Sequence, residues 1–67
     1  MINVKVNGVL MNVSASTIAE LLSELQIDPD RVVVEVNLEI VKKERFNEFT
    51  IKDGDSIEIV NFVGGGG

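Results

Sequence analysis

The 67-residue sequence contains neither cysteine nor histidine. Without cysteine the chain has no thiol nucleophile and no disulfide framework, and without histidine it lacks the commonest metal ligand. Tryptophan and tyrosine are absent as well, and Pro29 is the one proline. Chemistry that depends on a thiol or an imidazole of this chain is therefore excluded.

Positive charge is scarce, because six Lys and Arg residues stand against eleven Asp and Glu residues and leave a net charge of −5. Nucleic acid binding requires a basic face that neutralises phosphates, so nucleic acid is not an expected partner. The one basic cluster, Lys42, Lys43 and Arg45, is interrupted by Glu44 and is predicted to be a solvated loop. An acidic surface can instead steer the domain toward a basic partner.

Long hydrophobic runs are also missing. No apolar stretch approaches the ~20 residues that span a membrane, and residues 1–5 alternate instead of forming the apolar part of a secretory signal. With 45% hydrophobic and 25% charged residues, the composition is typical of one small globular domain. We expect a soluble cytoplasmic protein with no membrane partner.

The sequence does contain clear strand patterns. Residues 2–6 alternate between apolar and polar side chains, and in residues 9–13 Val9, Met11 and Val13 alternate with Leu10 and Asn12. The Asn7-Gly8 pair between the two segments is the strongest two-residue hairpin signal. Phe46 and Phe49 are expected to anchor an irregular segment on the core. Three further strands are predicted at residues 32–36, 40–41 and 56–62, with turns at residues 37–39 and 53–55.

One short amphipathic helix is predicted after the hairpin. Thr17 and Glu20 match a capping box, which explains Glu20 without a catalytic role. The helix is expected to end near Gln26 and to be closed by Asp28-Pro29-Asp30, because proline disfavours helical backbone in the residue before it. Its apolar side chains recur at helical spacing, at Ile18, Leu21, Leu22 and Leu25.

One helical stripe and one sheet face bury each other most economically in two layers. The predicted fold class is therefore α+β, a β-grasp or ubiquitin-like domain over residues 1–63. It has a mixed four- to five-stranded sheet packed on one helix. The last strand is expected to lie centrally and parallel to the first. A flexible tail is expected to follow it, formed by Gly64, Gly65, Gly66 and Gly67.

The glycine tail allows two interpretations. Glycine has no Cβ, and four residues reach roughly 13 Å at ~3.3 Å each, so the tail can carry a carboxylate through a narrow channel into another protein's active site. Glycine runs are also linkers without chemistry. A tail that leaves directly from a central strand favours the first interpretation.

The sequence resembles ThiS-type sulfur carriers of thiamin biosynthesis over nearly its whole length. The resemblance rests on INVKVNG at residues 2–8, TIAELL at 17–22, VVVEVN at 32–37 and KDGDSIEIV at 52–60, together with the glycine end. The chain departs from the family pattern in three places. Leu38 stands where glycine is usual, Phe46 stands where Trp is frequent, and four terminal glycines replace two.

The resemblance implies a carrier that is not itself an enzyme and binds no cofactor or metal. An adenylating, ThiF/E1-like enzyme would activate the Gly67 carboxylate with ATP and Mg²⁺, and a sulfur donor protein would convert it to a thiocarboxylate. Thiazole synthase would then take the sulfur for the thiazole ring of thiamin. Gly66 would fit closely beside Gly67, and Gly64 and Gly65 would supply reach.

The surface of the folded domain, and not the tail, is expected to dock the partner proteins. Phe62 and Val60, with Val33, are expected to share the sheet face away from the helix, where an exposed apolar group near the tail suits a partner. The alternative is that Phe62 serves packing alone. Asp53 and Asp55 are predicted to form a turn around Gly54, and no metal site is expected there because no third ligand is near in sequence.

Three other functions remain open. A MoaD-type small subunit of molybdopterin synthase shares the fold, the glycine end and the thiocarboxylate, but such chains are usually longer and often carry proline before the glycines. A carrier for another sulfur-transfer pathway is also possible. The third is a β-grasp interaction module with a linker-like tail and no chemistry at Gly67.

Overall fold

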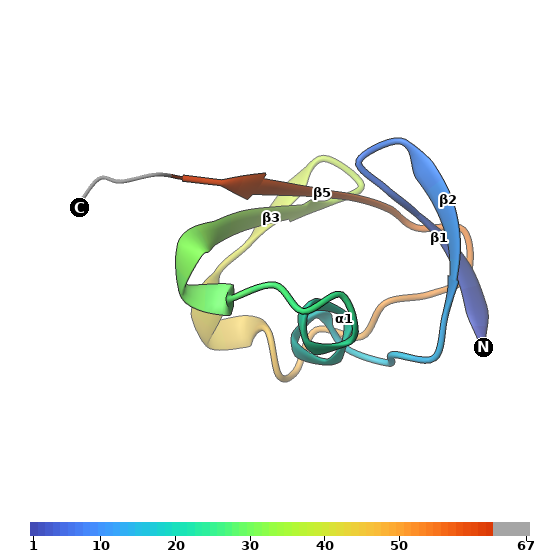
Figure 1. The fold of residues 1–67 in the computed structure, drawn as a ribbon, viewed down its shortest axis with the longest axis horizontal. Helices are drawn as coiled ribbons and strands as arrows, with labels where there is room; N and C mark the ends of the chain where they lie inside the picture. The colour runs from blue at the N-terminus through green and yellow to red at the C-terminus, as the bar shows by residue number, and fades with distance from the viewer. Residues whose placement is uncertain (63–67) are drawn as a thin grey trace.

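The computed structural model describes residues 1–62, which form a five-stranded mixed sheet with one α-helix against one face (Figure 1). The strand order is β2-β1-β5-β3-β4, with β5 parallel to β1 and antiparallel to β3. The predicted β-grasp arrangement is confirmed, with five strands and a central last strand. The elements are β1 (Ile2–Val6), β2 (Val9–Val13), α1 (Ile18–Glu24), the 3-10 helix η1 (Pro29–Arg31), β3 (Val32–Val36), β4 (Glu39–Val41), the 3-10 helix η2 (Lys43–Arg45) and β5 (Ser56–Asn61).

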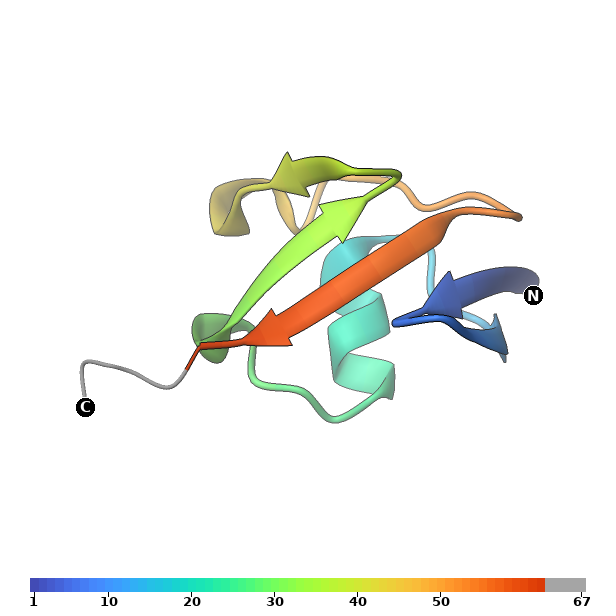
Figure 2. The same ribbon diagram turned by 90° about the horizontal axis from the view of Figure 1, so that it is seen from above.

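The core lies between α1 and the inner face of the sheet, and Figure 2 shows the helix beneath the central strands. Alternate residues of the strands point to this face, so an alternating sequence produces one buried side. Phe46 is buried and Phe49 is half-buried against the core, so both anchor the segment after β4 as predicted. The largest fully buried side chains are Ile18, Leu21, Leu22, Ile57, Val4, Val13 and Val34.

The ends of α1 differ in detail from the prediction. Thr17 Oγ1 accepts a hydrogen bond from the Glu20 N–H at 3.2 Å, but the Glu20 carboxylate accepts from the Ser16 N–H at 2.7 Å instead of reaching Thr17. The helix ends at Glu24, and Gln26 takes a left-handed φ of 60°. Pro29 does not close α1. It opens η1, where its missing N–H costs nothing.

Two tight hairpin turns, at residues 7–8 and 37–38, form hydrogen bonds with β5 from its two sides. In both turns the central residues have positive φ, which is the geometry of a type I′ turn. The Asn7 amide donates to the Ile59 carbonyl at 3.0 Å and accepts from the Ile59 N–H at 2.7 Å, so it extends the β1–β5 pairing beyond Val6. On the other side, the Asn37 amide oxygen accepts from the Ser56 N–H at 3.0 Å.

Candidate functional site

The candidate site begins at the end of β5, where the glycine-rich end of the sequence follows. β5 pairs with β3 along its length, from Ile57 opposite Val36 to Asn61 opposite Val32. The Phe62 N–H then donates to the Arg31 carbonyl at 3.0 Å. The backbone is therefore held by the sheet as far as Phe62. The predicted tail, Gly64, Gly65, Gly66 and Gly67, and the predicted domain boundary at residue 63 lie outside the described residues.

An exposed apolar patch lies on the outer face of the sheet beside this point. Val33 and Val60 are directly opposite each other in the β3–β5 register. They alternate with buried residues, so they face away from α1. Phe62 is 51% exposed and continues the alternation of Val60 along the chain. Ile40 on β4 is also exposed and shares this face, because it is opposite Glu35. We call these four residues the outer patch.

Two carboxylates adjoin the outer patch. Glu35 of β3 and Glu58 of β5 are directly opposite each other, an arrangement that normally costs stability because like charges repel across strands. Glu58 is exposed and Glu35 is half-buried. A partner surface that is apolar with Lys or Arg beside it would cover the outer patch and relieve this repulsion.

The sequence located Phe62, Val60 and Val33 but missed Ile40 and the Glu35–Glu58 pair. Each of these residues sits in a recognisable alternating segment. Which residues meet across strands, however, depends on a register that connects segments far apart in the chain. The turn at Asn37 and Leu38 fixes that register for β3 and β4. A two-residue turn at Asn37 and Leu38, read from the sequence, would have predicted that Ile40 lies opposite Glu35.

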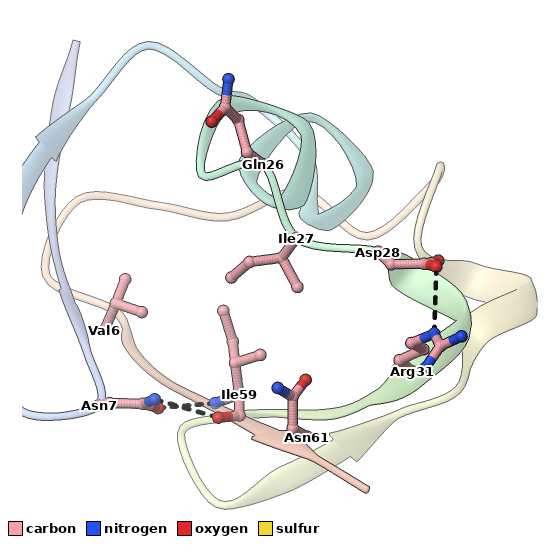
Figure 3. Close-up of a pocket in the computed structure, with 8 residues that line it drawn as sticks. All are labelled: Val6, Asn7, Gln26, Ile27, Asp28, Arg31, Ile59 and Asn61. Atoms are coloured by element: carbon pink, nitrogen blue, oxygen red, sulfur yellow. Dashed lines mark hydrogen bonds and ion pairs between the residues drawn. The ribbon is translucent and has the colours of Figure 1, made fainter. Parts of the chain in front are cut away.

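A cleft of about 450 Å³ lies on the helix side of β5. Figure 3 shows Ile27 pointing toward Val6 and Ile59 across it, with the Asn7 amide held against the Ile59 backbone. Arg31 and Asp28 pair at 3.6 Å at its edge, and both side chains are largely exposed. No local sequence pattern predicts this cleft, because it forms between the segment after α1 and strands that are distant in the chain.

Asp53 and Asp55 have structural roles. Asp53 Oδ1 accepts from the Asn3 N–H at 2.7 Å and Asp55 Oδ2 accepts from the Lys52 N–H at 2.8 Å, which confirms their predicted part in a turn. Within residues 1–62, no group of three or more His, Cys, Asp or Glu side chains could hold a metal ion. None of the helices described there is long and apolar enough to cross a membrane.

The basic cluster is a solvated segment, as predicted. Lys43 pairs with Asp30 and Arg45 lies 3.8 Å from Glu48, and all four side chains are more than 60% exposed. The hydrogen bond from Lys43 to the Asp30 carboxylate, together with their attraction, raises the pKa of Lys43. Exposed pairs of this kind contribute little stability and form no binding site by themselves.

The chain matches the model of the ThiS family over residues 4–66. It is 52% identical over 50 residues to the sulfur carrier protein ThiS of Bacillus subtilis, covering 75% of this chain and 76% of that protein. It is 50% identical over 62 residues to a thiazole synthase of Paramagnetospirillum magneticum, covering 91% of this chain but only 19% of the synthase. A crystal structure of the thiamine biosynthesis protein ThiS from Geobacter metallireducens matches with a TM-score of 0.84 and 38% identity, covering 96% of this chain and 99% of that one.

Proposed function

The chain belongs to the ThiS family, and from this premise we propose that its Gly67 carboxylate is the group that carries sulfur. The protein is a sulfur carrier of thiamin biosynthesis and not itself an enzyme. The observation that supports Gly67 is the run of four glycines that follows a central strand held by backbone hydrogen bonds as far as Phe62. A rigid base and a narrow end suit delivery into an enclosed active site.

The proposed chemistry takes place at one carboxyl group. A carboxylate is a poor electrophile, so an adenylating enzyme of the ThiF/E1 type transfers AMP from ATP to Gly67 with the help of Mg²⁺ and releases pyrophosphate. A donor protein then supplies sulfur at the oxidation level of hydrosulfide. This sulfur bonds to the Gly67 carbonyl carbon as the bond to AMP breaks, and the products are the thiocarboxylate and free AMP. ATP and Mg²⁺ belong to the activating enzyme, and the carrier supplies only the tail and a docking surface. The adenylation step requires ATP, so we propose that the carrier is located in the cytoplasm, where ATP is available.

We propose that the outer patch and the Glu35–Glu58 pair form the docking surface for the adenylating enzyme. Val60 and Phe62 are each about half exposed, and Phe62 is the last residue that the sheet holds before the tail. A partner that covers them fixes the direction in which the tail leaves the domain. The facing carboxylates add a preference for a basic surface on the partner.

Thiazole synthase is the proposed acceptor of the sulfur. This chain spans about a fifth of the length of a protein named thiazole synthase, which therefore carries a carrier-like segment in the same polypeptide. A covalent link of this kind keeps a carrier at high effective concentration near its enzyme. The relation favours the thiazole pathway over the pterin pathway of the MoaD type.

The test is an intact mass measurement after incubation with ATP, Mg²⁺, a ThiF-type adenylating enzyme and a sulfur source. The expected result is replacement of one oxygen atom by one sulfur atom, and none without ATP. Gly66→Val, which places a branched side chain beside the reacting carboxyl, should block conversion. Gly64→Ala is the matched control and should retain it. An unmodified mass, with Bacillus subtilis ThiS converted in the same mixture, would contradict the proposal.

A further inference from the structure

β2 is an outer strand of the sheet, and its side away from β1 has no neighbouring strand among residues 1–62. Lys5 and Asn7 donate their backbone N–H groups to carbonyls at Asp55 and Ile57, on the β5 side of β1. Backbone groups alternate in direction along a strand, so Val6, between them, faces β2. The same alternation along β2 leaves the N–H and C=O groups of two residues on the open side, Leu10 and Asn12.

This edge lacks the usual protection against pairing with another chain. Natural edge strands carry charges, proline or a bulge, or are very short. β2 has five residues, VLMNV, with no charge and no proline, and its register with β1 runs without interruption. The opposite edge differs, since β4 has three residues, includes Glu39 and is followed by Lys42 and Lys43.

We propose that β2 pairs antiparallel with β2 of a second copy and joins the two sheets into one. One register lets both open residues bond. Leu10 lies opposite Asn12 of the second copy, Asn12 lies opposite its Leu10, and Met11 sits on the two-fold axis. Each of the two opposed pairs exchanges both of its backbone hydrogen bonds. The interface is isologous and closes at two copies.

Charge and exposure favour a second copy as the occupant. β2 carries no charged side chain, so a symmetric pairing brings no like charges opposite each other. The exposed side chains Val9 and Leu10, at 56% and 69%, lose contact with water when the two strands meet. One strand pair buries a small area, so the dimer is weak and depends on concentration. The edge is separated from β5 by β1, so pairing leaves the proposed tail chemistry untouched.

Sedimentation equilibrium of the whole protein over concentrations up to about 1 mM tests the proposal. The average mass should rise from 7.3 kDa toward twice that value. Asn12→Pro removes the N–H on the open side, where an edge strand tolerates proline, and should weaken association at least about tenfold. Asn12→Ala is the control. It removes the same side chain, and with it the hydrogen bond to Asn3, but keeps the backbone N–H, so this variant should dimerise like the original protein.

Hydrogen exchange of the unaltered protein gives a readout that does not depend on any variant. The amides of Leu10 and Asn12 should exchange more slowly as concentration rises, whereas that of Ile40 on the other edge should not change. A constant mass of one chain at every concentration would overturn the proposal. Equal association of Asn12→Pro and Asn12→Ala, or concentration-dependent protection on β4 instead of β2, would overturn it as well.

Discussion

At the scale of single residues, Leu38 has a backbone conformation that suits glycine better than leucine. Its φ is 72°, a left-handed value that Gly8 adopts without cost in the equivalent turn. A Leu side chain in this conformation is strained by about 1–2 kcal/mol. Leu38 is also 90% exposed, so its side chain makes few packing contacts that could offset this strain. The departure from the family's usual glycine is therefore a cost in stability that the structure does not offset.

Leu38→Gly should stabilise the domain by about 1 kcal/mol, because it removes the strain at the cost of some freedom in the unfolded chain. Urea denaturation measures the free energy of unfolding, and an unchanged m-value would show that the unfolded state is the same. Gly8→Leu is the matched opposite and should destabilise by a similar amount. A Leu38→Gly domain less stable than the original would show that the turn is not strained.

At the scale of elements, β5 has separate roles on its two faces. Ile57 and Ile59 are buried against the core, while Val60 and Phe62 contribute to the outer patch. A polar substitution on the outer side should therefore alter binding without unfolding the domain. This separation makes the docking proposal testable by one side chain.

Phe62→Asp should weaken binding to the adenylating enzyme by about tenfold or more, because buried aromatic anchors carry much of an interface's binding energy. Titration calorimetry measures the affinity, and the free energy of unfolding should stay close to that of the original protein. Leu38→Asp removes another exposed apolar side chain, outside the outer patch, and should leave the affinity nearly unchanged. Equal affinity of the Phe62→Asp variant and the original protein would place docking elsewhere.

The elements also show how far the sequence alone could go. The two hairpins, the N-cap at Thr17 and the exposure of Val60 follow from local patterns, and all are present in the structure. The facing of Glu35 and Glu58 and the cleft beside Ile59 do not follow, because both depend on contacts between distant segments. The prediction that Pro29 closes α1 is wrong, because the helix ends earlier, at Glu24, before the left-handed residue Gln26.

At the scale of the whole molecule, the two faces of the sheet and its β2 edge have different roles. The inner face forms the core with α1, the outer face near Phe62 is the proposed docking surface, and the β2 edge, which has no neighbouring strand among residues 1–62, is the proposed site of self-pairing. The proposed function therefore requires two things of the fold, a stable base for the tail and an outer face that a partner can cover. Under the proposed function, sulfur held at Gly67 is passed on to build thiazole.

Transfer of isotopically labelled sulfur from the carrier to thiazole is the decisive test of this function. The carrier is first converted to the labelled thiocarboxylate and then mixed with thiazole synthase and its small-molecule substrates. The account predicts that the label moves into the thiazole product while the mass of the carrier returns to that of the carboxylate. Label that stays on the carrier with thiazole synthase, but leaves it with the large subunit of molybdopterin synthase and a pterin precursor, would contradict the account.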